Sequence, residues 1–327
     1  MNGGQGKRLA VFVASTFIDE VRAELTLAFD ATFAERGGDP VAELITRSGR
    51  GEHFDAVIFS LDVPMGSEVI RALPRGLRAL ATYSVGTDHV DLGAAADRGL
   101  AVFNTPGVLA DSVAENAIFL MLGAARRATE SIALLRSRSW SGWNPTQLVG
   151  VQLSGRSLGI LGMGDIGERI ARRASALGME ILYCNRRPLP EGHPLAEGYR
   201  ATAGELVAES DILMLACPST EETRRIVDDA LLSRAKAGMI LVNIARGDVV
   251  DDDALVDALR EGRVWAAGLD VFAGEPKVDA RYFDFPNVFM VPHIGSSTIE
   301  ARLGMGRILI EGLSGWEAGG EVRNRVA

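Results

Sequence analysis

Short apolar runs alternate with amphipathic stretches along the whole chain. In the first third, runs rich in aliphatic and β-branched residues predict buried strands at 9–14, 56–60, 80–84 and 100–104. The helical spacing of apolar positions predicts helices between these strands, for example at 18–29 and 67–73. This alternation is typical of a parallel sheet covered by helices.

The alternation continues after a long helical pattern at 112–127, where Ser112 and Glu115 have the spacing of a capping box. Further strands are predicted at 157–161, 179–184, 211–217, 239–244, 265–271 and 288–291. A last helical pattern at 298–313 is expected to return to the first domain. We therefore expect an α/β fold with two doubly wound parallel-sheet domains. One is discontinuous, at 1–103 and 295–327, and the other covers 104–294.

A glycine-rich turn in the second domain lies between the strand predicted at 157–161 and a helix predicted at 168–177. Gly162 permits a tight turn, Gly164 lets backbone N–H groups approach a pyrophosphate, and Gly167 lets the helix pack on the strand. A glycine pattern without these neighbours would be weak evidence. In this context it predicts a dinucleotide-binding Rossmann domain with cofactor contacts from Gly162, Gly164, Asp165, Ile166 and Gly167.

The end of the next predicted strand bears on the choice of cofactor. Asn185, Arg186 and Arg187 stand there, and Asn185 follows Gly162 by 23 residues. An acidic residue at this distance would bind the ribose 2′-hydroxyl of NAD, whereas an arginine accommodates the 2′-phosphate of NADP. The two guanidinium groups beside a neutral Asn185 predict that NADP(H) is favoured over NAD(H). The alternative is a solvated arginine pair in a loop before Pro188.

The composition and net charge of the chain limit the kinds of molecule that it is expected to bind. The 327 residues are 47% hydrophobic, which is enough for two packed cores, and the net charge of −9 argues against a general nucleic-acid surface. The apolar stretch at 9–14 is too short for a signal or membrane segment, so we expect a cytoplasmic protein without membrane attachment. The two cysteines, Cys184 and Cys217, lack paired spacing and are expected to be small core residues. We expect no metal site.

Three ionisable residues each come shortly after a predicted strand of the second domain, within four residues of its end: Arg246, Glu275 and His293. Open α/β sheets bind ligands at the carboxyl ends of their strands. Reduction of a 2-keto acid needs a cation for the carboxylate and an acid that protonates the carbonyl oxygen. Arg246 and His293 have these properties, and Glu275 beside the imidazole would orient it and favour its protonated form.

Several motifs occur in a fixed order, at 83–91, 104–115, 243–247, 268–276 and 292–295. Together they resemble the D-isomer-specific 2-hydroxyacid dehydrogenase family over nearly the whole chain. The resemblance implies a flavodoxin-like substrate domain and a Rossmann cofactor domain, with Arg246, Glu275 and His293 as the catalytic residues. It also implies that the backbone N–H groups of Val85 and Gly86 hold the substrate carboxylate.

The same resemblance implies further cofactor contacts. Asp270 would face the nicotinamide carboxamide, and Thr105 and Ala245 would line the cofactor cleft. Cys217, His293 and Gly295 belong to the same expected set. Asp165 departs from the family pattern, because many relatives carry Arg there, and a carboxylate near a pyrophosphate is unfavourable unless it points into solvent.

Within the family, the segment 140–145 resembles glyoxylate/hydroxypyruvate reductases, in which a tryptophan of this loop reaches the active site of the partner subunit. We expect Trp143 to take this role and to contact the substrate, with Trp140 as the second choice. The implied partners are a second copy of the chain and a small 2-keto acid. A tryptophan that serves only as an interface anchor is the alternative.

Three functional hypotheses remain at this point. The first is NADPH-dependent reduction of glyoxylate and hydroxypyruvate. The second is the same chemistry on another acid, such as a bulkier 2-keto acid or 3-phosphoglycerate. The third is a dinucleotide-responsive binding protein resembling the C-terminal binding protein corepressors, which the fold alone does not exclude. Formate oxidation is disfavoured, because that branch of the family is expected to carry Gln where this chain has Glu275.

Overall fold

The computed structural model describes residues 8–327, and these form two compact units. One unit comprises the described residues up to Leu109 together with Ser297–Ala327, and the other is Ala110–Ser296. The sequence placed the corresponding boundaries at 103/104 and 294/295, and this division stays a prediction. Among the described residues, no helix is both long enough and apolar enough to cross a membrane.

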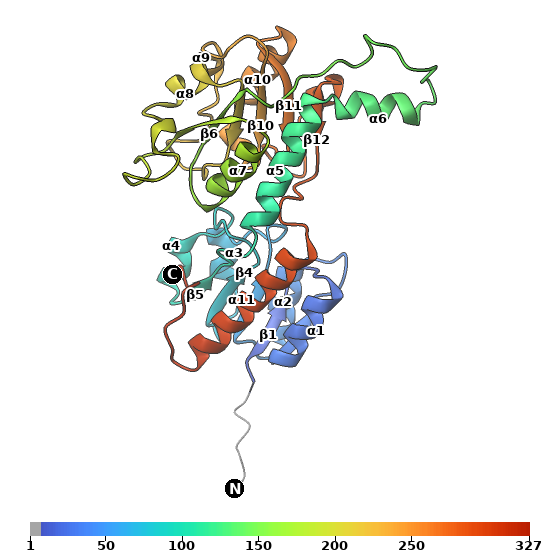
Figure 1. Ribbon diagram of the computed structural model, residues 1–327. Helices are drawn as coiled ribbons and strands as arrows, with labels where there is room; N and C mark the ends of the chain where they lie inside the picture. Colours follow the sequence, from blue (N-terminus) through green and yellow to red (C-terminus); the bar gives the residue numbers. More distant parts are fainter. Residues whose placement is uncertain (1–7) are drawn as a thin grey trace. The chain divides into compact units, whose positions relative to one another are not determined.

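The first unit is a parallel sheet of five strands in the order β2-β1-β3-β4-β5. Its strands are β1 (Ala10–Val13), β2 (Asp30–Phe33), β3 (Ala56–Phe59), β4 (Ala79–Thr82) and β5 (Ala101–Phe103). Its helices are α1 (Asp19–Ala28), α2 (Pro40–Gly49), α3 (Ser67–Ala72), α4 (Leu92–Asp97) and α11 (Ile299–Glu317). This strand order is that of flavodoxin-like folds. Helix α11, from the end of the chain, packs beside α1 (Figure 1).

Strand β2 was not expected from the sequence. Its residues are exposed or half-buried, whereas every residue of β1, β3, β4 and β5 is buried. The other strands were predicted from continuous apolar runs. An edge strand pairs with only one neighbour and is not covered on all sides, so it does not need such a run. The strand forms because it pairs with β1 along its whole length.

The second unit contains a parallel sheet of seven strands in the order β12-β11-β10-β9-β6-β7-β8. Its strands are β6 (Ser157–Leu161), β7 (Glu180–Cys184), β8 (Tyr199–Arg200), β9 (Ile212–Leu215), β10 (Met239–Asn243), β11 (Val264–Leu269) and β12 (Val288–Met290). The first six strands in chain order reproduce the Rossmann arrangement, which reverses direction between β6 and β9. Two doubly wound α/β units are thus confirmed.

Helices cover both faces of this second sheet (Figure 1). The helices of the unit are α5 (Ala110–Ala125), α6 (Ala128–Arg136), α7 (Asp165–Ala176), α8 (Ala203–Glu209), α9 (Asp229–Leu232) and α10 (Asp252–Arg260), with 3-10 turns η1 (Ala196–Gly198), η2 (Gly247–Val249) and η3 (Ala280–Asp284). All of these helices except α6 lie against the sheet. Helix α5 packs against α7, and α9 packs against α8 and α10. Because parallel crossovers are right-handed, α8, α9 and α10 cover the face opposite α7.

The helix predicted at 112–127 differs from the observed one in two ways. Helix α5 begins at Ala110, so Ser112 lies inside the helix and its hydroxyl donates to the carbonyl of Gly295 at 2.7 Å. The predicted capping box is therefore wrong, because the side chain of Ser112 bonds a distant loop instead of the helix start. At the other end Arg127 takes a left-handed conformation, with φ of 57°, and α6 begins after it.

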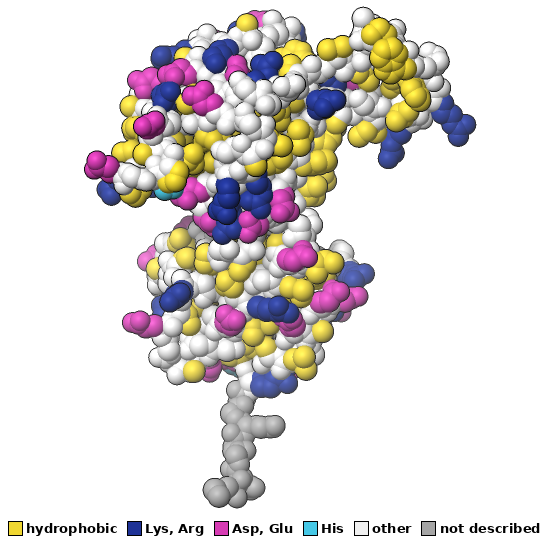
Figure 2. All heavy atoms as spheres, viewed as in Figure 1, with side chains coloured by type: hydrophobic (Ala, Val, Ile, Leu, Met, Phe, Trp, Pro, Cys, Tyr) yellow, Lys and Arg dark blue, Asp and Glu magenta, His cyan; other side chains and the backbone are white. Residues whose placement is uncertain are grey.

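Helix α6 and the loop that follows it extend away from the sheet of the second unit (Figure 1). No residue of α6 is buried, and Figure 2 shows apolar side chains gathered on this projection. The strongly exposed ones include Ile132, Leu135, Trp140, Trp143 and Val149. We call residues 128–149 the arm. An exposed apolar surface of this kind is typical of a protein interface.

Both cysteines lie in the core of the second unit. Cys184 ends β7 and Cys217 follows β9, and both are free and buried. Burial raises the pKa of the Cys217 thiol to about 11, so it stays neutral. The expectation that they are small core residues is confirmed.

Candidate functional site

The glycine turn after β6 fulfils the steric requirements predicted for it. Gly162 has φ of 103°, and a Cβ atom there would lie 2.6 Å from the backbone nitrogen of Cys217. A Cβ atom at Gly167 would lie 2.4 Å from the carbonyl oxygen of Gly162. At Gly164, by contrast, a Cβ atom would meet no atom within 4 Å. Gly162 and Gly167 are therefore needed for close backbone packing. Gly164 borders an open space.

Gly164 is the N-cap of α7, and the helix begins at Asp165. The first backbone N–H groups of a helix have no partner within it, so those of Asp165 and Ile166 are available to an anion beside this open space. These residues fit the pyrophosphate of a dinucleotide. Cys217 belongs to the same place, because its backbone forms the wall against which Gly162 packs.

Asn185 fixes the glycine turn from the neighbouring strand. Its Oδ1 accepts the N–H of Met163 at 3.0 Å, and its Nδ2 donates to the carbonyl of Met163 at 3.0 Å. The following residues, Arg186 and Arg187, are exposed. Arg186 lies near enough to Glu222 that its charge contributes to lowering the pKa of that carboxyl, after the hydrogen bond from Thr220. Asn185 thus stabilises the glycine turn, and the guanidinium groups of Arg186 and Arg187 lie in solvent.

Arg246 stands on a turn that is built by Asn243, the last residue of β10. Asn243 is buried, and its Oδ1 accepts the N–H of Ala245 while its Nδ2 donates to the carbonyl of Arg246 at 2.9 Å. Gly247 follows, and a Cβ atom there would lie 1.8 Å from the carbonyl carbon of Phe272. The Arg246 turn is therefore pressed against the segment that leads to Glu275.

Asp270, just after β11, holds the segment that carries His293. Its two carboxylate oxygens accept the N–H groups of Ile294 at 2.7 Å and Gly295 at 3.0 Å, and its carbonyl accepts the N–H of His293 at 2.8 Å. Burial raises the pKa of the Asp270 carboxyl above its ordinary value, although these N–H groups oppose the shift. His293 has φ of 52°, a left-handed conformation that costs about 1 kcal/mol or more in a residue other than glycine.

His293 and Glu275 form a direct pair. Nδ1 of His293 lies 2.7 Å from Oε2 of Glu275, and Oε1 of Glu275 accepts the N–H of Phe272 at 2.9 Å. Burial of the Glu275 carboxyl opposes its ionisation. The hydrogen bonds from His293 and Phe272 and the charges of His293 and Arg246 outweigh burial and hold the pKa of Glu275 below its ordinary value. The three predicted catalytic side chains therefore lie within electrostatic reach of one another.

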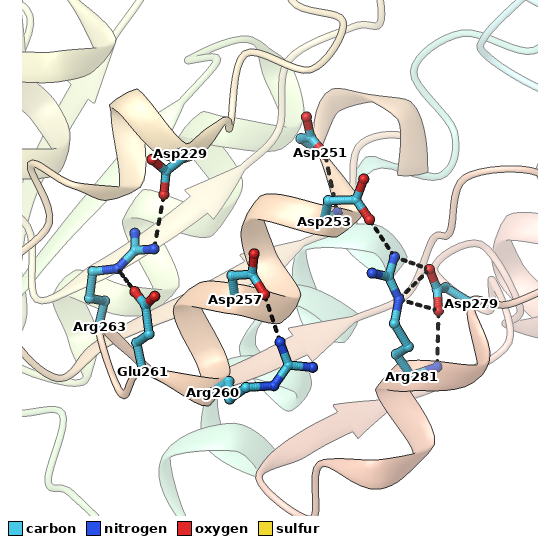
Figure 3. Close-up of polar contacts among 9 residues, drawn as sticks. All are labelled: Asp229, Asp251, Asp253, Asp257, Arg260, Glu261, Arg263, Asp279 and Arg281. Carbon is cyan, nitrogen blue, oxygen red and sulfur yellow. Dashed lines mark hydrogen bonds and ion pairs between the residues drawn. The ribbon is translucent and has the colours of Figure 1, made fainter.

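The far ends of the Arg246 and Glu275 loops are joined by ion pairs (Figure 3). Arg281 binds Asp279 at 2.6 Å and Asp253, at the start of α10, at 2.8 Å. The hydroxyl of the buried Tyr282 donates to Asp252 at 2.7 Å. Because α10 follows the Arg246 turn and Asp279 follows the Glu275 loop, these contacts tie the two loops together.

The first unit carries the segment predicted to bind the substrate carboxylate. The carbonyl of Val85 accepts from Nδ2 of Asn104 at 2.9 Å, and that of Gly86 accepts from the hydroxyl of Ser84 at 2.7 Å. Within residues 8–327, no hydrogen bond is found for the N–H of Val85 or Gly86. Thr105, in the same unit, is fully buried, and its hydroxyl has no hydrogen-bond partner among the described residues.

Within the second unit, the structure brings together the glycine turn residues with Asn185 and Cys217, and separately Arg246, Glu275, His293, Asp270 and Gly295. Trp143 is 83% exposed on the arm, and Trp140 donates to Gln147 at 3.3 Å.

Sequence reasoning missed Asn243 and the hydroxyl of Ser112. The sequence signals for Asn243 were its place near the end of a predicted strand and at the start of the segment 243–247, and neither gave it a role of its own.

A family model matches most of the second unit. The model for the NAD binding domain of the D-isomer specific 2-hydroxyacid dehydrogenases matches residues 118–295, more than half of the 327 residues. A glycerate dehydrogenase of Hyphomicrobium methylovorum is 40% identical over 270 residues, covering 81% of this chain and 83% of the relative. A glyoxylate reductase of Thermococcus gammatolerans is 41% identical over 269 residues, covering 81% and 80%.

A solved structure extends the similarity over nearly the whole chain. The NADPH-dependent glyoxylate/hydroxypyruvate reductase of Sinorhizobium meliloti, in complex with NADP and malonate, superimposes with a TM-score of 0.86 at 34% identity. The match covers 98% of this chain and 97% of the other. The resemblance noted in the sequence is thus confirmed. This chain belongs to the D-isomer specific 2-hydroxyacid dehydrogenases and is an enzyme of the glyoxylate reductase-like kind, with a domain for a nicotinamide dinucleotide.

Proposed function

We propose that the protein reduces glyoxylate and hydroxypyruvate with NADPH and that Arg246, Glu275 and His293 are its catalytic residues. The observation that carries this proposal is the His293–Glu275 pair at 2.7 Å, which lies at the carboxyl ends of the strands in the same unit as the glycine turn. Open α/β sheets bind ligands at this edge.

His293 is the general acid. Its Nδ1 faces Glu275, so Nε2 is left for the carbonyl oxygen of the substrate. Glu275 fixes the ring and stabilises the imidazolium, because its carboxylate is ionised and is itself held by the N–H of Phe272. When bound, the nicotinamide dinucleotide supplies the hydride that reaches the carbonyl carbon. Loss of the proton from Nε2 to the forming alkoxide completes the reduction of the keto group.

Arg246 binds the substrate carboxylate and polarises the adjacent carbonyl group. A guanidinium group donates two parallel hydrogen bonds to a carboxylate, which fixes the orientation of a small substrate. The N–H groups of Val85 and Gly86 are proposed to donate to the same carboxylate. Their carbonyls are already bonded to Asn104 and Ser84, and no hydrogen bond of these N–H groups is found within the described part of the chain.

Arg186 and Arg187 are proposed to bind the 2′-phosphate of NADPH. Both are exposed at the end of β7, next to the strand that carries the glycine turn, and no carboxylate of the chain forms an ion pair with either within the described residues. The NADPH dependence of the Sinorhizobium meliloti enzyme supports this choice. Asp270, Thr105, Ala245 and Gly295 complete the proposed cofactor contacts.

The substrate is proposed to be short. The relatives are named for glyoxylate, hydroxypyruvate and glycerate, and glycerate is the reduction product of hydroxypyruvate. A second copy of the chain is proposed to cover the exposed arm. Trp143 would then reach the partner's active site and limit the length of the substrate.

Initial rates with NADPH and NADH across glyoxylate, hydroxypyruvate, pyruvate and phenylpyruvate test the proposal. We expect the highest kcat/KM with NADPH and the two shorter polar acids. His293→Ala should lower kcat by about 10²- to 10⁴-fold, whereas His53→Ala, which removes an exposed histidine of the first unit that pairs with Asp55, should leave it unchanged. A preference for phenylpyruvate would assign another substrate, and no turnover of any acid would favour a binding role.

A further inference from the structure

The phosphate-facing end of α7 carries an acidic side chain. Asp165 is the first residue of this twelve-residue helix and follows Gly164 directly. A carboxylate in the first turn interacts favourably with the helix dipole. It also repels any anion that binds the same backbone N–H groups. A dinucleotide site with an unmasked Asp165 would therefore bind its pyrophosphate less tightly.

Arg169 holds this carboxylate from one turn further along the helix. Its Nε lies 2.8 Å from Oδ1 of Asp165, and its Nη1 binds Asp111 on α5. Arg173, the next residue on the same helix face, binds Asp111 at 2.8 Å and Glu115 at 3.4 Å. The guanidinium of Arg169 is thus fixed between two carboxylates, Asp165 and Asp111. Arg173 forms its ion pairs with α5, and it also donates to the backbone carbonyl of Arg169 at 3.2 Å.

We propose that Arg169 masks the charge of Asp165 and thereby permits tight binding of the dinucleotide pyrophosphate at the start of α7. This inference rests on the proposed function only in that a nicotinamide dinucleotide binds the glycine turn. Arg169 is a positioning residue: it acts through Asp165 and helix α7 and touches no reacting atom.

The pairing of Arg169 with Asp165 predicts how substitutions of the two residues affect dinucleotide binding, singly and together. Arg169→Gln removes the cation and leaves Asp165 as a bare anion beside the phosphates, so binding should weaken. Asp165→Asn removes the repulsion at its source. If masking is the role of Arg169, its loss should matter only while Asp165 is charged, and the double variant should bind like Asp165→Asn alone.

Arg173→Gln is the matched control. It removes an arginine from the same helix and breaks the same kind of ion pair with α5, but it does not touch Asp165. A purely structural role in tying α5 to α7 would make Arg169→Gln and Arg173→Gln equivalent. Thermal unfolding of the unliganded variants reports this structural contribution separately.

Binding is measured directly, by fluorescence titration with NADPH and by calorimetry with ADP and with adenosine. We expect Arg169→Gln to raise Kd for NADPH and ADP about three- to tenfold at low salt, less at high salt, and to leave Kd for adenosine unchanged. Arg173→Gln should change each Kd less than about twofold, because Arg173 lies one turn further from the phosphates and does not pair with Asp165. Asp165→Asn combined with Arg169→Gln should restore binding.

Three results would overturn the inference: equal losses for Arg169→Gln and Arg173→Gln, an equal loss with adenosine, or no restoration by Asp165→Asn. If the wild-type protein binds NADPH and ADP and one of these results is found, only the role of Arg169 is wrong. If the wild-type protein binds neither NADH, NADPH nor ADP, the proposed function fails and this inference fails with it.

Discussion

Nδ1 of His293 lies 2.7 Å from Oε2 of Glu275, and the pair is fixed on both sides. The other oxygen of Glu275 accepts the N–H of Phe272, and the backbone N–H of His293 donates to the carbonyl of Asp270. Phe272 and Asp270 both follow β11, so a single strand end positions the acid and its partner. The left-handed backbone of His293 is the conformational cost of this arrangement.

The first prediction concerns the pH dependence of reduction. Glu275→Gln removes the anion that stabilises the imidazolium, so the alkaline limb of the kcat/KM profile should move to lower pH. Glutamine keeps an oxygen for the N–H of Phe272, so the loop should hold its place. Steady-state rates between pH 5 and 10 check this, and an unmoved alkaline limb would show that Glu275 is not the partner of His293.

The second prediction concerns stability. Because the pKa of Glu275 lies below its ordinary value, the ionised group contributes stability above the unfolded carboxyl pKa and loses it as pH falls through the folded value. The wild-type protein should therefore have a higher Tm than Glu275→Gln at pH 7, and the difference should shrink only as pH falls below the ordinary carboxyl pKa of 4.5. A difference that grows as pH falls below this value would contradict the sign of the shift.

The third prediction separates the two roles of the glycine turn. Gly167→Ala places a Cβ atom 2.4 Å from a backbone oxygen, so it should destabilise the unliganded protein by about 1–3 kcal/mol. Gly164→Ala meets nothing within 4 Å, so its Tm should stay within a degree or so of wild type while NADPH binding weakens. Denaturant unfolding and fluorescence titration measure the two effects. Full NADPH affinity in Gly164→Ala would remove this turn from the phosphate site.

The fourth prediction tests the cofactor preference. Charge-assisted hydrogen bonds contribute about 1.5–3 kcal/mol each, so replacing both Arg186 and Arg187 by Ala should lower the ratio of NADPH to NADH efficiency at least about tenfold. Efficiency with NADH should change little. Arg172→Ala is the control, because Arg172 is an exposed arginine of the same unit on helix α7. An unchanged ratio in the double variant would refute the assignment.

The sequence predicted those parts of the fold that burial dictates. Continuous apolar runs revealed β1, β3 and β6, because both faces of a central parallel strand are covered. The half-exposed β2 has no such run, and the two-residue β8 is too short for any periodicity. Both strands exist because a neighbouring strand pairs with them, and this pairing leaves no local pattern.

In the candidate site, too, the sequence predicted some residues and missed those that depend on tertiary contacts. His293 and Glu275 could be found because each is a reactive side chain within a few residues of the end of a predicted strand. The roles of Asn243 and Ser112 could not, since each depends on a hydrogen bond to a backbone carbonyl that folding brings close. Ser112 bonds a residue 183 positions away in the chain. Its local spacing to Glu115 suggested a capping box, and the tertiary contact overrode it.

The fifth prediction is that Trp143 completes the active site of a second copy of the chain. It is 83% exposed and stands on the arm with Ile132, Leu135 and Trp140, a surface that a partner would cover. Trp143→Ala should lower kcat/KM for glyoxylate and hydroxypyruvate and relax the rejection of bulkier keto acids. NADPH affinity should stay nearly constant, because the glycine turn belongs to one chain.

Mixed dimers decide whether the tryptophan acts across the interface. A His293→Ala chain paired with a Trp143→Ala chain places both lesions in one site and leaves the other intact if Trp143 acts on the partner. About half of the wild-type activity per dimer is then expected, because one of two sites works. If Trp143 acts within its own chain, each site carries one lesion, and the activity cannot exceed half that of the Trp143→Ala dimer. Differently tagged chains, purified in tandem, allow the measurement, and full activity in a dilute monomer would end the hypothesis.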